Sequence, residues 1–150
     1  MNLSVYINKL PKEVIYLILS YSYKPQSKHM LEDIRHYSSS KIETFRLYRE
    51  IWIEHFNEEE IADKNWLIND IISYANNNYH TIYGYNDYYL KIIFRNPFVR
   101  NNAEALRYIY ILENGSLEKE INLYWGLFKI HEREDIITRA KTQLDIINVI

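Results

Sequence analysis

Apolar residues recur along most of the chain at intervals of three and four positions, the spacing that places them on one side of an α-helix. The first such stretch begins at Pro11, whose fixed φ suits the first turn of a helix, and ends before Pro25. Similar stretches cover residues 28–56, 58–75, 101–114 and 117–150. We therefore expect an all-α fold, organised as a single compact multi-helix bundle over residues 1–150.

Polar residues predict where these helices begin. Ser27 can cap the second helix, and Asn101 with Glu104 matches a capping box, in which the two side chains accept from exposed backbone N–H groups of the first turn. Ser40 with Glu43 fits the same pattern, so we expect a helix break at the run of three serines. One bent helix that continues through the serines is the alternative.

The helical periodicity also predicts which side chains face the core. In the segment YYLKIIFRN the pattern does not decide, so one short strand-like segment near residues 88–95 remains an alternative to a helix. The positions expected to face inward are Leu31, Ile34, Ile42, Phe45, Tyr48, Trp52, Phe56, Ile61, Trp66 or Leu67, Ile68, Ile71, Ile72, Ala105, Leu106, Ile109, Leu112, Leu123, Leu127, Ile130, Ile137, Leu144 and Ile147, with Met30 as a further candidate.

The clearest loop is NNNYHTIYGYND at residues 76–87, because Asn and Gly tolerate left-handed backbone and favour turns. In and just after it, YHTIYGYNDYY places five tyrosines within eleven residues. Tyrosine combines an apolar ring with a polar tip and is enriched where proteins meet. We expect Tyr79, Tyr83, Tyr85 and Tyr88 to bind protein. An A/T-rich genome is the competing explanation for the high tyrosine count, although it explains the local crowding less well.

Composition and charge narrow the class of function. The formal net charge is −2, and the charges alternate along the chain, so no basic surface for nucleic acid is expected. The chain contains no cysteine, which excludes disulfides and thiolate metal sites. Residues 1–9 lack the pattern of a secretory signal, and no apolar run approaches the ~20 residues of a membrane span. We expect a soluble protein that is not secreted.

Residues that could support chemistry are few. His29, Asp33 and His36 share one helix face and could ligate a metal, but a solvated polar face explains them more simply. The sequence contains no phosphate-binding glycine loop, nucleophile elbow or His-Glu-x-x-His motif. We expect no catalytic residue, no metal, no cofactor and no enzymatic activity.

Residues 10–21, LPKEVIYLILSY, resemble the start of an F-box. Together with the turn YSYKPQ (21–26) and the helix LEDIRHY (31–37), they resemble an F-box-like N-terminal segment found in uncharacterised proteins of large nucleocytoplasmic DNA viruses. The resemblance covers about residues 8–56. After Pro25 the chain departs from cellular F-boxes, because a long helix replaces their Val-Cys-x-x-Trp close. Residues 57–150 carry no recognisable family motif.

The resemblance implies a docking surface for the adaptor subunit of cullin-type ubiquitin ligases. The residues that it assigns to this surface are Leu10, Pro11, Val14, Ile15 and Ile18, with Leu31 as a further candidate. The C-terminal helical region would then contact a target protein, in the host cytoplasm or in the virion. Two alternatives remain open: a structural component of the virion, such as a minor capsid, cement or assembly protein that binds capsid subunits, and a small enzyme or nucleic-acid binder.

Overall fold

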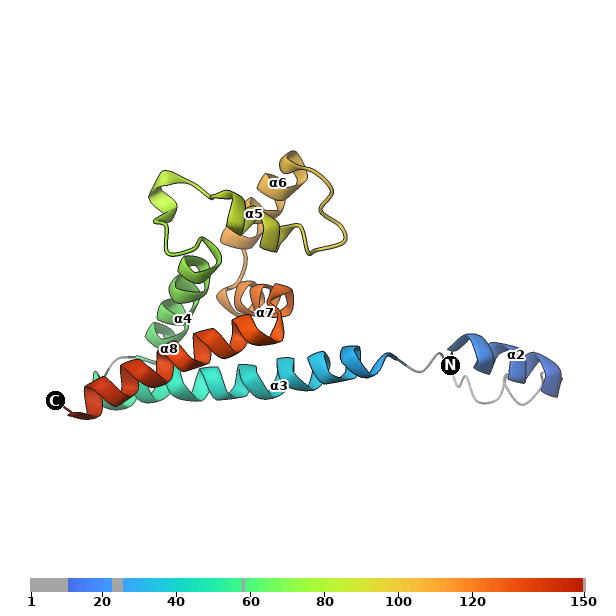
Figure 1. Cartoon of the computed structure of the whole chain (residues 1–150), viewed down its shortest axis with the longest axis horizontal. Coiled ribbons are helices and arrows are strands. Elements are labelled where there is room, and N and C mark those ends of the chain that lie inside the picture. Colours follow the sequence, from blue (N-terminus) through green and yellow to red (C-terminus); the bar gives the residue numbers. More distant parts are fainter. Residues whose placement is uncertain (1–10, 23–25, 58, 150) are drawn as a thin grey trace. The chain divides into compact units, whose positions relative to one another are not determined.

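The computed structural model of the chain describes residues 11–22, 26–57 and 59–149. The chain divides into two compact units, Met1–Glu32 and Asp33–Ile150, which are described separately. Within the described residues there are seven α-helices, one π-helix, one 3-10 helix and no strand (Figure 1). The expected all-α fold is confirmed, while the inclusion of both units in a single domain stays a prediction.

The helices follow one another with short connections. Their bounds are α2 (Lys12–Ser22), α3 (Lys28–Arg49), the π-helix η1 (Glu50–His55), α4 (Glu60–Ala75), the 3-10 helix η2 (Thr81–Tyr83), α5 (Asp87–Ile93), α6 (Asn102–Glu113), α7 (Leu117–Leu127) and α8 (Ile130–Val149).

The first unit contains α2 and the first residues of α3. Pro11 directly precedes α2, and its carbonyl oxygen accepts from the backbone N–H groups of Val14 at 3.0 Å and Ile15 at 3.1 Å. The predicted cap of α3 is confirmed, because the backbone N–H of Met30 donates to Oγ of Ser27 at 3.2 Å.

The predicted break at the serine run is wrong, since α3 continues through residues 38–40. Oγ of Ser39 donates back to the carbonyl oxygen of Arg35 at 3.1 Å, so this hydroxyl bonds within the helix instead of ending it. Ser40 is buried, and its Oγ accepts a hydrogen bond from Nε1 of Trp125 at 3.0 Å. A tertiary contact therefore uses the serine that the sequence pattern assigns to a cap.

The buried side of α3 also differs from the prediction. It is formed by Ser40, Thr44, Leu47 and Tyr48 and continues with Ile51 of η1. Three of these five residues carry hydroxyl groups, so the spacing of apolar residues alone does not identify this side of the helix. Among the positions expected inside, Leu31, Ile34, Ile42 and Phe56 are exposed, and so is the further candidate Met30.

Residues 88–95 are not a strand, because α5 covers most of them. The side chain of Asn86 caps this helix by accepting from the backbone N–H of Tyr89 at 2.9 Å. Tyr89, Ile92 and Ile93 are buried at the spacing of one helix face. The apolar periodicity of this segment does not distinguish a helix from a strand, and the structure shows a helix whose buried face packs in the core.

The core of the second unit forms around α4, which contacts α5, α7, α8 and η1. From α4 the core receives Leu67, Ile68, Ile71 and Ala75, so Leu67 and not Trp66 is the inward residue of the predicted pair. The side chain of Ile61 lies outside the described residues.

Two arginines connect α8 to its neighbours. Arg133 is almost fully buried, and it donates to the carbonyl oxygen of Trp125 at 2.8 Å and to Oδ1 of Asp33 at 2.9 Å. Arg95 forms a double hydrogen bond with the buried Glu132, at 2.5 and 2.8 Å. These contacts fix α8 against α3, α7 and the end of α5.

The C-terminal helices follow the sequence pattern closely. The cap of α6 is confirmed: Oδ1 of Asn101 accepts from the N–H of Glu104 at 3.0 Å, and Oε2 of Glu104 accepts from the N–H of Arg100 at 2.7 Å. Residues 117–149 form two helices, α7 and α8. Every inward position predicted in this region is buried or half-buried, whereas Leu106 of α6 is exposed.

Candidate functional site

A single buried side chain organises the loop between α4 and α5. Asn76 directly follows α4 and is inaccessible to solvent. Its Nδ2 donates to the carbonyl oxygens of Tyr79 at 2.7 Å and Gly84 at 3.2 Å, and its Oδ1 accepts from the backbone N–H of Asn86 at 2.9 Å. Because an Asn amide has two donors and one acceptor oxygen, these bonds engage both of its polar atoms.

The backbone of the loop reverses at residues suited to positive φ. Asn77 and Asn78 have φ of 52° and 59°, and Gly84 has φ of 98°. Asn tolerates this region better than other residues with a Cβ, and glycine adopts it without strain. The Asn-rich and Gly-containing sequence therefore supplies the residues that this tight path needs. Figure 1 shows the loop leaving the end of α4 and returning into α5.

The fixed loop presents apolar side chains to solvent. Ile82 is 82% exposed, Tyr83 is 69% exposed and Tyr79 is 50% exposed. The rings of Tyr79 and Tyr83 lie 5.8 Å apart between centroids and support one another. We call residues 76–86 the pinned loop. The predicted contact residues Tyr79 and Tyr83 lie on it, and Ile82 between them is one that sequence reasoning missed.

Tyr85 has a different position from the other loop tyrosines. It is half-buried, its ring stacks on Tyr89 at 4.2 Å, and its hydroxyl donates to Oε1 of Glu113 on α6. Burial and then the bond to Glu113 raise the pKa of Tyr85 well above its usual value, so the hydroxyl stays a donor. Tyr85 therefore anchors the end of the loop while remaining partly accessible to solvent.

The hydrogen bonding continues from this anchor into the core. The hydroxyls of Tyr89 on α5 and Tyr124 on α7 are bonded to each other, and both rings are fully buried. Burial raises the pKa of both phenols. The tyrosines of this segment thus divide into buried anchors and exposed ones.

A hollow of about 480 Å³ lies where the pinned loop meets α4 and α6. Trp66, Tyr79, Tyr85, Asp70 and Glu113 all line it. Trp66 is exposed, although one face of its indole stacks on Trp52 of η1 with a centroid distance of 4.4 Å and an interplanar angle of 4°. The hollow joins aromatic and acidic groups from three separate parts of the chain. No single stretch of sequence reveals this combination.

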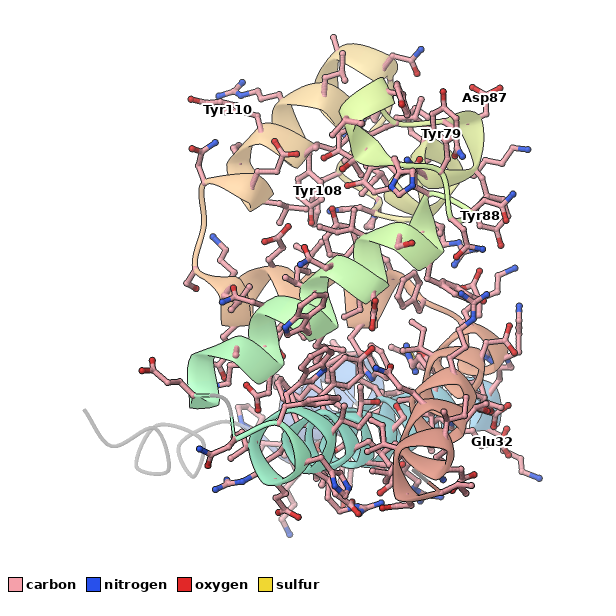
Figure 2. The ribbon with its side chains drawn as sticks, turned by 90° about the vertical axis from the view of Figure 1, so that its left-hand side faces the viewer. Glu32, Tyr79, Asp87, Tyr88, Tyr108 and Tyr110 are labelled. Carbon is pink, nitrogen blue, oxygen red and sulfur yellow. The ribbon has the colours of Figure 1, made fainter. Side chains whose placement is uncertain are left out.

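Tyr88, the fourth predicted contact residue, lies on α5 and is exposed. In Figure 2, Tyr79, Asp87 and Tyr88 lie toward one side of the view, while Tyr110 lies at the opposite side on α6. The exposed tyrosines are therefore not all gathered at the pinned loop. Leu106, Tyr110 and Ile111 expose further apolar area on α6, and Ile146 and Val149 do so on α8.

In the first unit, the structure describes part of the predicted docking surface. Pro11 and Val14 are exposed, Val14 to 38%, and Ile15 is half-buried. Leu10 and the side chain of Ile18 lie outside the described residues. Tyr16 and Leu17 are also exposed, so apolar side chains occur on more than one side of α2.

Two of the three residues considered for metal binding, Asp33 and His36, are engaged in other contacts. Oδ1 of Asp33 accepts from Arg133, and Nε2 of His36 lies 3.5 Å from a carboxylate oxygen of Glu134. Among the described residues, no group of three or more His, Asp and Glu side chains is placed to hold a metal ion.

Comparisons of the chain with protein-family models, with curated proteins and with solved structures gave no match. Of the helices in the described ranges, none combines the length and the apolar character needed to cross a membrane.

Proposed function

We propose that this chain is a non-enzymatic protein–protein interaction protein, in which the pinned loop contacts a partner and the F-box-like segment provides a second docking surface. The observation that carries the proposal is the combination of strong exposure and fixed conformation at Tyr79, Ile82 and Tyr83. An exposed Ile82 does not gain the free energy that burial of its side chain would give. A loop that is fixed at both ends also loses conformational entropy. The fold bears both costs at this loop.

The physical argument concerns the entropy of binding. A flexible loop loses conformational freedom when a partner binds, which weakens the complex. The bonds from Asn76 to Tyr79, Gly84 and Asn86 fix the loop before any partner arrives. Tyrosine rings then add large contact area with few rotatable bonds. Such a surface suits recognition of another protein.

The first unit would serve as the docking segment. Val14 and Leu17 of α2 expose apolar area, as an F-box-like helix requires if it binds an adaptor subunit of a cullin-type ubiquitin ligase. In this proposal the second unit selects the target protein. The chain would be a protein of a large DNA virus, and it would act in the host cytoplasm.

A second candidate is a structural component of the virion, such as a minor capsid, cement or assembly protein. It is favoured by the number of separate exposed apolar positions, because Phe98, Tyr110 and Val149 lie on different elements from the pinned loop. A protein wedged among several capsid subunits would cover all of these positions, whereas an adaptor with one target would cover fewer.

A pull-down with matched variants tests the proposal. The Val14→Asp/Ile18→Asp variant should lose the ligase adaptor subunit that the wild type captures, and Ile82→Ser/Tyr83→Ala should lose the target but keep the adaptor subunit. Tyr16→Asp is the control for α2, because it places an aspartate on the opposite side of the helix, and it is compared with Val14→Asp alone so that each variant adds one negative charge. If the wild type captures no adaptor subunit, the docking role is wrong. Detection of the chain in purified particles would then favour the virion component.

A further inference from the structure

We propose that the hollow beside the pinned loop binds an arginine side chain of the partner protein. This inference rests on the proposed function, since it names the chemistry of the residue that the partner contributes. It depends on a different set of side chains, however: Trp66, Asp70 and Glu113, which come from α4 and α6.

The first argument is charge. Asp70 and Glu113 both line the hollow and both are exposed, and neither forms an ion pair with a described residue. No lysine or arginine lies among the described residues that line it, and His80 is the one basic type present. Arg139 lines a neighbouring hollow that Asp70 also reaches, but it is not part of the lining here and forms no ion pair with Asp70. Two carboxylates in a recess whose own described lining holds no lysine or arginine favour a positively charged occupant.

The second argument is the unused hydrogen-bonding capacity of these carboxylates. The hydroxyl of Tyr48 donates to Oδ2 of Asp70 at 2.5 Å, and the hydroxyl of Tyr85 donates to Oε1 of Glu113. Each carboxylate is thereby oriented by a tyrosine of the fold. Its other oxygen accepts no hydrogen bond from the described residues, so it is available to an N–H donor from outside.

The third argument is the aromatic lining. Trp52 covers one face of Trp66 and leaves the rest of the indole exposed beside the hollow. Tyr79 and Tyr85 contribute two further rings. A cation over an aromatic face gains electrostatic energy, and tryptophan is the best partner. Arginine fits better than lysine, because its planar guanidinium can stack on the indole while its N–H groups reach a carboxylate.

The hollow has a suitable size for this role. Its volume of about 480 Å³ falls within the range of about 300–1,000 Å³ that is common for small-molecule sites. It lies next to Tyr79, which also belongs to the exposed surface of the pinned loop. A partner that covers the loop can therefore insert one side chain into the hollow.

The test uses Nα-acetyl-arginine amide as the probe, titrated into the full chain and followed by ¹H–¹⁵N chemical shifts. The matched neutral probe is Nα-acetyl-citrulline amide, which has nearly the same shape without the charge. We expect arginine to shift the indole N–H signal of Trp66 and the amide signals of residues 79–85, and to bind at least about fivefold more tightly than citrulline, as expected for about 1 kcal/mol of charge attraction.

The decisive variant is Asp70→Asn/Glu113→Gln. Each amide oxygen can still accept from Tyr48 or Tyr85, so the variant removes the charge and keeps the internal bonds. It should bind both probes equally, whereas Asp145→Asn, on an exposed acid of α8, should behave as wild type. Single variants replace the double variant if its spectrum shows unfolding.

Equal binding of arginine and citrulline to the wild type, or shifts confined to other regions, would overturn the inference. Equally tight binding of Nα-acetyl-lysine amide would overturn the assignment to arginine. The proposed function is tested separately by the Ile82→Ser/Tyr83→Ala variant, because the titration requires no partner protein. Failure of one is therefore distinguishable from failure of the other.

Discussion

Asn76 and Asn86 bind each other twice across the base of the pinned loop. The backbone N–H of Asn86 donates to Oδ1 of Asn76 at 2.9 Å, and Nδ2 of Asn86 donates back to the carbonyl oxygen of Asn76 at 2.7 Å. The two residues are ten positions apart in sequence. Because Asn76 is buried, water does not compete for these bonds, and the loop between them has one defined conformation.

Replacement of Asn76 by alanine should release this loop. The variant leaves the carbonyl oxygens of Tyr79 and Gly84 and the N–H of Asn86 without their partner, which we expect to lower the free energy of unfolding by about 2–4 kcal/mol. Urea denaturation measures the loss, and hydrogen exchange should be faster throughout residues 79–86. Asn65→Ala, on the exposed side of α4, is the control and should change the free energy by less than about 0.5 kcal/mol. An unchanged exchange rate in the Asn76 variant would contradict the role of this residue.

The serine run of α3 offers a comparison between adjacent residues. Ser40→Ala removes the acceptor of the buried Nε1 of Trp125 and should cost about 1–3 kcal/mol. Ser39→Ala removes only a hydroxyl that bonds back to its own helix on the exposed side, and it should be neutral or slightly stabilising. Thermal or urea unfolding of the two variants checks the difference. Equal effects would mean that Trp125 does not depend on Ser40.

The ion pair between Arg95 and Glu132 predicts a dependence of stability on pH. Burial raises the pKa of Glu132, but the hydrogen bonds from Arg95 and from the backbone N–H of Lys129 lower it more, so the pKa is below its usual value. A depressed carboxyl pKa stabilises the fold above the unfolded value of about 4.3, and this contribution is lost as the pH falls through the folded value.

The corresponding variant is Glu132→Gln. It should lower the free energy of unfolding by about 1.5–3 kcal/mol at pH 7, and the gap to wild type should shrink below about pH 4, where the wild type also loses the charge. Urea titrations at pH 7, 5 and 3.5 measure the gap. Glu118→Gln, on an exposed acid of α7, should show no such trend. A gap that stays constant down to pH 3.5 would contradict the pairing of Glu132 with Arg95.

The sequence predicts the helical class and most helix bounds because apolar spacing and caps are local signals. The cap at Asn101 and the turn at Asn114 and Gly115 follow from residues that are close in sequence. The side of α3 that is buried could not be predicted in the same way. The buried hydroxyl of Ser40 accepts from Nε1 of Trp125, and the buried hydroxyl of Thr44 donates to the carbonyl oxygen of Ser40. These bonds satisfy the two polar groups inside the fold, and the pattern of apolar residues in α3 does not indicate them.

The candidate site was predictable in part for the same reason. The crowding of tyrosines indicates an exposed loop, and Tyr79 and Tyr83 are exposed there. The sequence does not reveal that Asn76 organises the loop, since its partners depend on the closed path of the backbone. Nor does it reveal that Trp66 and Glu113, 47 positions apart by their numbers, line one hollow.

The most direct test of protein recognition by the pinned loop is site-specific photo-crosslinking. A photoreactive phenylalanine replaces Ile82 in the wild-type chain and in the Asn76→Ala variant, and Lys129, which is exposed outside the loop, is the control position. We predict one defined protein adduct from position 82 that is strongly reduced in the Asn76 variant and absent from position 129. No adduct from position 82, or the same adduct from both positions, would contradict the account.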